Sequence, residues 1–192
     1  MTAGVPERAD ARANRERLID AAEAVFAELG LATEMKTVAE RAGLGVGTIY
    51  RNFATKDDLL AAVLDRLVAR GTAIVAQASS LADPAEAVAA IIHAACEHAE
   101  ANSGLFHAIF SGGIPPDCMP ADRSLELQQL MAGVLERGQA SGAFRTDMPA
   151  AFLAAFLDAF FMTYLELRRS MPAEGIKERL ALLFLDAVRP PG

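Results

Sequence analysis

The chain of 192 residues has little of what marks several protein classes. It holds only two cysteines, Cys96 and Cys118, too few for a disulfide framework, so we expect reduced thiols in a cytoplasmic protein. Its first residues are charged almost from the outset and lack an apolar centre, so we expect no secretory signal. Sustained alternation of apolar and polar residues is also missing. The absence of such alternation predicts an all-α fold.

Long apolar runs are scarce as well. The most apolar stretch, Ala150 to Leu165, is interrupted by Asp158 and falls short of the roughly 18 residues that suggest a membrane span. We therefore expect no membrane partner. Hydrophobic residues still make up 53% of the chain, and the mean hydropathy is +0.24. This composition supports a well-formed core and argues against extended disorder.

Positive charge is in deficit overall, although nucleic-acid-binding domains are usually basic. The formal net charge is −7 and the sequence pI is about 5.0. Residues 1–70 hold ten Lys and Arg against eleven Asp and Glu, whereas residues 71–192 hold eight against fourteen. Within residues 33–56 four basic residues face two acidic ones. Since phosphate contact depends on local charge, this segment can still bind DNA.

Residues 33–56 are predicted to form two short helices joined by a turn. The first is expected over residues 34–42, between Thr33 as N-cap and Gly43 as its stop. The second is expected over residues 46–53, with a leading glycine that lets the chain turn tightly. Helix, glycine-containing turn and helix form the helix-turn-helix unit, whose second helix enters the major groove of DNA.

The outward face of the second helix has side chains suited to nucleic acid. Arg51 can pair with guanine and Asn52 with adenine, and Thr48 can meet a thymine methyl group or a phosphate. Tyr50 can donate its hydroxyl to a phosphate oxygen. A helix pair with a glycine turn is also a common supersecondary unit, so this pattern alone leaves both interpretations open.

A longer motif narrows the choice. From Ala42 the sequence reads A-G-L-x-x-G-T-I-Y-x-x-F-x-x-K-x-x-L-L. Over residues 12–68 it resembles the DNA-binding domain of the tetracycline-repressor (TetR) family of bacterial transcription regulators, with Gly45 and Val46 departing from the commonest pattern. The resemblance implies base contacts from the second helix and phosphate contacts around it. The expected DNA-binding residues are Thr33, Thr37, Val46, Gly47, Thr48, Tyr50, Arg51, Asn52 and Lys56.

The chain ahead of this motif is expected to begin with a flexible arm over residues 1–11. The helix-turn-helix domain is then expected over residues 12–55, and an effector-binding and dimerisation domain over residues 56–192. Near the N-terminus, four arginines can contact the minor groove or phosphates, or simply be solvated: Arg8, Arg12, Arg15 and Arg17.

Apolar periodicity and glycine or proline breaks predict about nine helices. The first has a stripe from Leu18 to Leu29 and ends at Gly30. Thr55 and Asp58 form a capping box that starts a long helix reaching about Ser79, the expected mechanical link between the domains. Asp83 is expected to cap the next helix. Later helices are expected over residues 85–101, 103–110, 123–139, 149–170 and 173–188, with a loop over residues 111–120.

The last two predicted helices are apolar on more than one face. A helix of this kind has to be buried on several sides, and in a chain this small one side is expected to face a second subunit. The family resemblance implies the same homodimer through the last two helices.

Large, adaptable side chains and nearby polar groups are candidates for an effector pocket, which the resemblance to ligand-responsive repressors favours over a plain core. The expected effector is small and apolar or amphipathic. The candidate ligand-binding residues are His93, Cys96, Phe106, His107, Phe110, Met131, Phe152, Phe156 and Phe160.

An alternative is a helical metal-binding protein or enzyme that uses His93, Cys96 and His107. No fourth ligand is obvious, and no orienting group for a Cys nucleophile is visible. A monomeric protein-interaction module is a further alternative. Neither explains residues 33–56. We therefore expect no enzyme activity, metal or cofactor, and predict a cytoplasmic, ligand-responsive repressor that binds a palindromic operator as a dimer.

Overall fold

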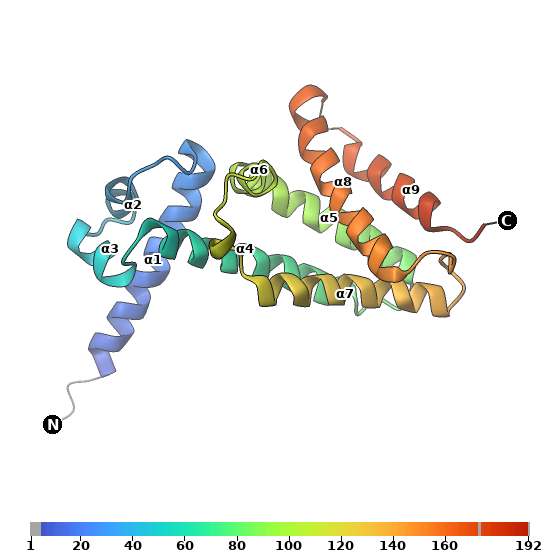
Figure 1. Cartoon of the computed structure of the whole chain (residues 1–192), viewed down its shortest axis with the longest axis horizontal. Coiled ribbons are helices and arrows are strands. Elements are labelled where there is room, and N and C mark those ends of the chain that lie inside the picture. Colours follow the sequence, from blue (N-terminus) through green and yellow to red (C-terminus); the bar gives the residue numbers. More distant parts are fainter. Residues whose placement is uncertain (1–4, 173, 192) are drawn as a thin grey trace. The chain divides into compact units, whose positions relative to one another are not determined.

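The computed structural model describes residues 5–172 and 174–191, with side chains described from Asp10 onward. These residues are helical apart from their connections, and no strand occurs among them (Figure 1). The all-α prediction is confirmed. The helices are α1 (Val5–Leu29), α2 (Met35–Arg41), α3 (Val46–Asn52), α4 (Lys56–Ala78), α5 (Pro84–Ala101), α6 (Ser103–Phe110), the 3₁₀ helix η1 (Pro116–Cys118), α7 (Ala121–Ala140), α8 (Ala150–Ser170) and α9 (Ile176–Val188).

The chain forms two compact units that do not follow a single cut in the sequence. The N-terminal unit comprises the chain up to Arg66 together with Asn102–Pro120. The C-terminal unit comprises Leu67–Ala101 and the chain from Ala121 onward. Helix α4 therefore contributes to both units, and α6 with η1 belongs to the N-terminal one. The assignment of DNA binding to residues 12–55 and of effector binding and dimerisation to residues 56–192 stays a prediction.

In the N-terminal unit, α1 is the central helix, with α2 and α3 beside it (Figure 1). Its apolar stripe is buried as predicted, except that Leu29 at the helix end is 59% exposed. Helix α6 also packs on α1, and it comes close because residue 104 is glycine. A Cβ at Gly104 would lie 2.8 Å from the carbonyl oxygen of Ala27. This contact ties residues 102–120 to the N-terminal unit.

Helix α1 starts earlier than predicted. Residues 5–11, expected to precede the first helix as part of an arm, are its first turns. Pro6 falls in the first turn, where its missing N–H costs no helical hydrogen bond, and the following residues are rich in the helix formers Ala and Arg. The rest of the expected arm, residues 1–4, lies outside the described residues.

Two of the three predicted helix caps are confirmed. The Thr55 N–H donates to Asp58 Oδ2 at 2.9 Å, and the Asp58 N–H donates to Thr55 Oγ1 at 3.0 Å. The Ala85 N–H donates to Asp83 Oδ1 at 2.8 Å. The Thr33 cap is wrong: Glu34 occupies the N-cap of α2 without a side-chain bond. The Thr33 hydroxyl instead donates to the Gly30 carbonyl at 2.9 Å, closing the turn after α1.

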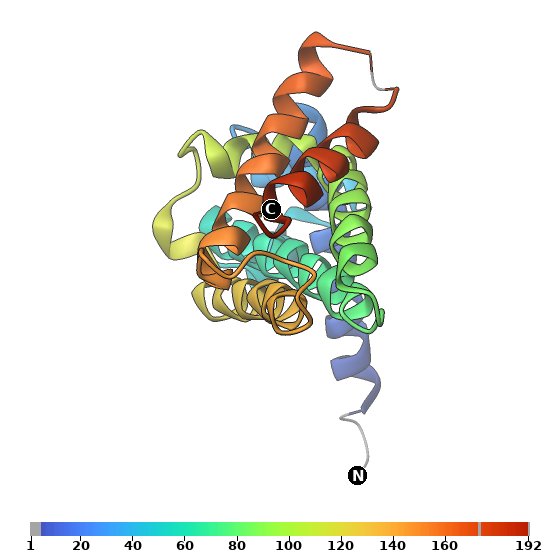
Figure 2. The ribbon, with the colours of Figure 1, turned by 90° about the vertical axis from the view of Figure 1, so that its right-hand side faces the viewer.

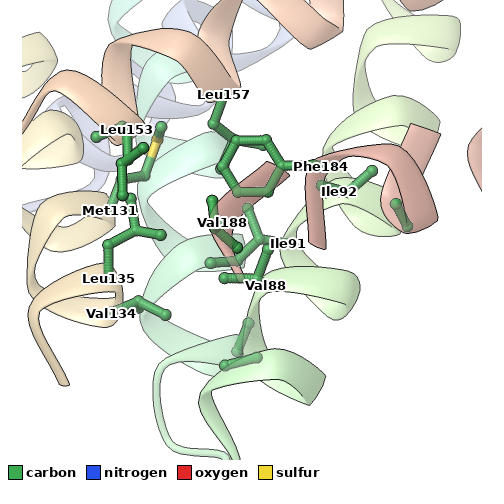
Figure 3. Close-up of a cluster of buried hydrophobic side chains, with 14 of the residues drawn as sticks. Val88, Ile91, Ile92, Met131, Val134, Leu135, Leu153, Leu157, Phe184 and Val188 are labelled. Carbon is green, nitrogen blue, oxygen red and sulfur yellow. The ribbon is translucent and has the colours of Figure 1, made fainter. Parts of the chain in front are cut away.

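The C-terminal unit is a helical bundle in which α8 packs on α5, α7 and α9 (Figure 2). Figure 3 shows its core, where side chains from α5, α7, α8 and α9 meet. Phe184 of α9 is fully buried there, beside Leu157 of α8 and Ile91 of α5. A Cβ at Gly138 of α7 would lie 2.0 Å from the ring of Phe144, so only glycine fits at that position.

Helix α8 is longer than its apolar stretch suggested. It has 21 residues and is, by length and composition alone, apolar enough to cross a membrane, so the expectation that this segment is too short is wrong. Core helices of soluble proteins meet the same criterion. Only 28% of its most apolar window is buried within the described chain, which leaves apolar side chains of α8 at the surface.

Candidate DNA-binding interface and effector unit

The turn between α2 and α3 is built around Gly43. Its φ of 65° lies in the left-handed region, which an L side chain rarely adopts. The Leu44 N–H then donates to the Ala39 carbonyl at 2.9 Å, which closes the end of α2. Gly45 follows as the N-cap of α3 without a side-chain cap, in extended backbone. Gly45, which departs from the commonest family pattern, therefore leaves α3 intact.

Helix α3 has one buried and one exposed face, as predicted. Ile49 is fully buried, and Phe53, the residue just after the helix, is 2% exposed. By contrast, the side chains of Val46, Tyr50 and Arg51 are exposed. This arrangement presents the side chains of α3 to a partner without disturbing the core of the N-terminal unit.

Thr48 lies at the centre of a small polar group on α3. Its hydroxyl accepts a hydrogen bond from Arg51 Nη2 at 3.1 Å, and its carbonyl accepts one from Asn52 Nδ2 at 2.8 Å. Thr48 and Asn52 are half-buried, whereas Arg51 is exposed. The three predicted base-contacting residues are thus neighbours, with Arg51 the most accessible.

The residues expected to contact phosphates occupy mixed environments. Gly47 is exposed, while Thr33 and Thr37 are half-buried. Lys56 is also half-buried, and its ammonium donates to the Leu31 carbonyl. Because an ammonium has three N–H groups, this bond leaves donors for a second acceptor.

Two arginines near the N-terminus have roles that the sequence did not reveal. Arg17 Nη2 donates to the Ala42 carbonyl at 2.7 Å, and Arg15 Nη1 donates to the Asn52 carbonyl at 3.4 Å. The Arg15 guanidinium also lies 4.3 Å from the centre of the Phe53 ring. These contacts join residues 25 to 38 positions apart in the chain, so no local pattern signals them.

Further ion pairs occupy other charged groups of this unit. Arg41 forms a bidentate ion pair with Glu28, in which Nη1 donates to Oε1 at 3.1 Å and Nη2 donates to Oε2 at 2.6 Å. The guanidinium holds the pKa of Glu28 below its usual range. Arg66 Nη1 lies 2.6 Å from Asp20 Oδ1, and Arg66 Nη2 lies 2.6 Å from Glu23 Oε2. The net positive charge expected over residues 33–56 is therefore partly neutralised by α1.

The candidate effector residues divide between the two units. Those of the C-terminal unit are His93, Cys96, Met131, Phe152, Phe156 and Phe160; those of the N-terminal unit are Phe106, His107 and Phe110 on α6. Cys96 and Met131 are buried, whereas Phe152 is 57% exposed and Phe156 is 40% exposed. Burial raises the pKa of the Cys96 thiol to about 12, so the thiol is neutral and unreactive.

An aromatic cluster joins α8 and α9. The ring centres of Phe156 and Phe160 lie 5.1 Å apart, and those of Phe160 and Phe184 lie 5.3 Å apart, both edge to face. Phe184 was not among the predicted effector residues. On α6, the rings of Phe106 and Phe110 stack with their centres 6.2 Å apart. Two of the predicted aromatic residues thus serve packing between the last two helices.

A polar network at the other end of α8 was also missed by the sequence. Buried Tyr164 hydrogen-bonds to Glu100, and Arg168 Nε donates to the same carboxylate at 2.7 Å. The tyrosine bond first, and then the arginine, hold the pKa of Glu100 below its usual range. Lys177 of α9 lies 3.2 Å from Glu97. The Tyr164 hydroxyl therefore binds a carboxylate of the protein itself.

Among the residues that the structure describes, no three His, Cys, Asp or Glu side chains are grouped so as to hold a metal ion. His93 and Cys96 share α5, whereas His107 lies on α6. The geometry that a metal enzyme would need is therefore not found in this part of the chain.

The helix-turn-helix with its exposed α3 face, joined to a helical bundle, defines a DNA-binding transcription regulator with a regulatory domain. Comparison with known protein families supports the same class. Residues 18–63 match the family described as "Bacterial regulatory proteins, tetR family", and residues 83–190, more than half of the chain, match "Transcriptional regulator SbtR-like, C-terminal domain". The chain belongs to the TetR family of ligand-responsive transcription regulators.

Individual relatives support this assignment. The transcriptional repressor KstR2 of Mycobacterium tuberculosis is 33% identical over 153 residues, which cover 74% of this chain and 75% of the relative. The crystal structure of the TetR regulator SCO0520 from Streptomyces coelicolor is 30% identical with a TM-score of 0.63, covering 93% of this chain and 99% of that one. A Rhodococcus sp. RHA1 protein of unknown function has a TM-score of 0.77 at 18% identity, covering 91% and 95%, and shows the shared fold alone.

Proposed function

We propose that this regulator is a cytoplasmic homodimeric repressor, without enzyme activity, that reads a palindromic operator with α3. The observation that carries the proposal is the division of α3 into a buried side at Ile49 and an exposed side at Tyr50 and Arg51. Two such helices related by a two-fold axis suit half-sites about one DNA turn apart. Thr48, Arg51 and Asn52 contact bases in this proposal.

Phosphate contacts fix the register of α3 on the operator. We assign them to Tyr50, Lys56, Thr37 and the exposed backbone of Gly47. Thr33 is the weakest of the predicted phosphate contacts, because its hydroxyl proton is engaged by the Gly30 carbonyl. Exposed Val46 at the start of α3 is suited to an apolar contact with a thymine methyl group.

The proposed dimer forms through α8 and α9. Their outer surfaces expose large apolar side chains that the described chain leaves uncovered: Phe152, Phe156, Met162, Leu182 and Leu183. Leu182 and Leu183 are each 61% exposed. An apolar surface of this kind on two adjacent helices is suited to a four-helix interface about a two-fold axis.

The proposed effector is a small apolar or amphipathic molecule bound by the C-terminal unit. Apolar side chains dominate that unit, and His93 is half-buried on α5 beside buried Ile92. KstR2 of Mycobacterium tuberculosis, a relative of this chain, is described as a ketosteroid transcriptional regulator. That description supports an apolar effector for the present chain.

Regulation in this proposal acts through conformational preference. An effector that binds better to the conformer in which the two α3 helices mismatch the operator shifts the population toward that conformer. Couplings of about 1 to 3 kcal/mol, typical of allosteric proteins, are enough to lower operator affinity substantially. Helix α4 is the proposed link because it contributes to both units.

Two substitutions test whether α3 reads sequence. The operator is first selected by the wild-type protein from a library of random DNA duplexes. Arg51→Ala is expected to cost about 1 to 3 kcal/mol of operator affinity, concentrated at one base position. Lys56→Ala is expected to weaken all sequences alike and to reduce the salt dependence by about one counterion. Equal losses on operator and random DNA for Arg51→Ala would remove it from base reading.

A further inference from the structure

We propose that Arg15 and Arg17 of α1 are positioning residues for operator recognition, which hold the ends of α3 and α2 instead of anchoring phosphates. The proposal rests on the recognition role proposed for α3. Both guanidinium groups donate to backbone carbonyls within the protein, Arg15 to Asn52 and Arg17 to Ala42. Each carbonyl belongs to the C-terminal end of a short helix.

The C-terminal end of a helix is where a cation is most useful. The last carbonyls have no partner inside the helix, and the aligned peptide dipoles place partial negative charge there. Arg17 reaches the C-cap residue of α2 at 2.7 Å, and its Nη2 also lies 3.4 Å from where a Cβ would stand at Gly43. It thus closes the turn that leads into α3.

Helix α3 depends on such support because few side chains hold it. It has seven residues and a single buried one, Ile49, whereas α2 has three buried residues. Phe53 adds an anchor after the last turn, and the Arg15 guanidinium covers its ring at 4.3 Å while reaching the Asn52 carbonyl. Arg15 therefore restrains the end of α3 from which Arg51 and Asn52 project.

Arg12 provides an internal comparison on the same helix. It is exposed, and no hydrogen bond or ion pair involves it among the described residues. Arg12 and Arg15 carry the same charge less than one helical turn apart, so long-range attraction to DNA is nearly equal for both. A difference between their alanine variants therefore reports the contacts of Arg15 with Asn52 and Phe53.

Positioning and phosphate anchoring make different predictions for DNA binding. Base contacts need accurate placement of α3, whereas non-specific binding depends on charge alone. Arg15→Ala and Arg17→Ala are therefore expected to reduce operator affinity about tenfold, with random-DNA affinity changed no more than by Arg12→Ala. For both variants, the slope of log affinity against log salt concentration should fall no more than it does for Arg12→Ala. Arg15→Lys should fail to restore specificity, because an ammonium lacks the planar group that covers Phe53.

The experiment measures fluorescence anisotropy of the full-length variants on the selected operator and on a random duplex, at several salt concentrations. Amide hydrogen exchange without DNA is recorded alongside. Arg15→Ala should speed exchange in residues 46–53 more than in residues 35–41, and Arg12→Ala should change neither. Arg15→Gln, which keeps N–H donors, serves as a second variant if Arg15→Ala lowers the melting temperature strongly.

The outcomes separate the two roles. Loss of specificity with faster exchange in α3 supports positioning. Equal weakening on both duplexes, a salt slope lowered by about one and full rescue by Arg15→Lys would overturn it in favour of a phosphate contact. Unchanged binding and exchange would overturn it as well. If the wild-type protein selects no sequence, the proposed operator function fails, while the exchange data still decide whether Arg15 positions α3.

Discussion

At the residue scale, the basic side chains of the N-terminal unit divide between internal partners and solvent. Arg15, Arg17 and Lys56 bind backbone carbonyls, and Arg41 is paired with Glu28. Among the described residues, Arg51 hydrogen-bonds only to the nearby Thr48 hydroxyl, a contact it can exchange for a base at little cost. Its accessibility, more than the total positive charge, makes it the leading candidate for base recognition.

Asp158 shows how a single half-buried carboxyl group affects stability. It lies on apolar α8 without a hydrogen-bond or ion-pair partner among the described residues, and burial raises its pKa from 3.8 to about 6. The folded state thus holds this proton more tightly than the unfolded chain, so stability is lost as pH rises from about 4 to about 6. Asp158→Asn should remove this loss.

The expected gain for Asp158→Asn at pH 7 is about 1 kcal/mol in the free energy of unfolding, allowing for its partial exposure to solvent. Urea unfolding between pH 4 and pH 7 measures it, with Asp10→Asn, at an exposed aspartate beyond the first turn of α1, as the control. An Asp158→Asn protein whose stability keeps the wild-type pH dependence would show that Asp158 is well solvated.

The inward and outward residues of α3 were predictable because helical spacing alone separates them. Ile49 and Phe53 lie four positions apart and are both buried, as expected. The bonds made by Arg15 and Arg17 were not predictable, since they join residues that meet only after folding. The Thr33 bond to Gly30 is local, but a hydroxyl at this position can either cap the helix that follows or close the turn that precedes it, and the sequence pattern does not distinguish the two.

At the element scale, α4 is anchored at both ends but weakly packed in between. Leu64 and Leu67 are buried, as are Val75 and Ala78, whereas none of residues 68–74 is buried. This stretch contains Gly71 and a Thr72 hydroxyl that donates to the Val68 carbonyl at 3.0 Å, features that weaken or bend a helix. Such a region is suited to a link that must change conformation.

Gly71→Ala is expected to stiffen α4. The added Cβ would meet Leu127 Cδ2 at 3.6 Å, an ordinary contact, so the variant should gain about 0.5 to 1 kcal/mol in the free energy of unfolding. Gly133→Ala in α7, where a Cβ meets nothing within 4 Å, is the matched control for helix propensity. Urea unfolding gives both values. A destabilised Gly71→Ala protein would contradict this account of α4.

Most element boundaries were predictable because glycine, proline and capping residues mark them. Gly30 ends α1, and the Thr55 and Asp58 capping box starts α4. The start of α1 was not predictable, because the first turns of this helix lack an apolar stripe. Helix α9 begins at Ile176 and not at residue 173, since Gly175 adopts a left-handed conformation with φ 74°.

At the scale of the whole molecule, the proposed dimer covers apolar surface that a monomer leaves exposed. Leu183→Glu places a charge among the exposed apolar side chains of α8 and α9 and should weaken association by about 2 kcal/mol or more. Leu125→Glu on α7, at a leucine that is 54% exposed, is the matched control. Sedimentation equilibrium should give twice 20.3 kDa for the wild type and the control.

A Leu183→Glu protein that remains as dimeric as the wild type would place the interface elsewhere. A monomeric wild type would instead favour a protein-interaction module with an exposed docking surface. The same experiment also bears on α8, which is long and apolar enough to cross a membrane. A dimer that is stable in water without detergent would explain the exposed apolar side chains of α8 by subunit contact and not by a membrane.

The all-α class and the helix-turn-helix were predictable, because both follow from local spacing. The membership of residues 102–120 in the N-terminal unit was not. It depends on the approach of Gly104 to the Ala27 carbonyl and of Cys118 to the Asp57 carbonyl, with Sγ to oxygen at 3.7 Å. The sequence pattern of these residues predicts a short helix and a loop, and it does not show which unit they pack against. The three candidate effector residues on α6 therefore lie in the N-terminal unit, whereas the other six lie in the C-terminal unit.

The central claim is that a dimer of this chain binds a specific operator, and the most direct test uses the DNA that flanks its own gene. Anisotropy titrations with random-sequence competitor are made at two salt concentrations. Saturation is expected at two protomers per duplex, with affinity at least about 10³-fold above that for random DNA. Weak binding that is equal on flanking and random DNA would contradict sequence reading at that site, and equal binding across genome-wide fragments would contradict the claim itself.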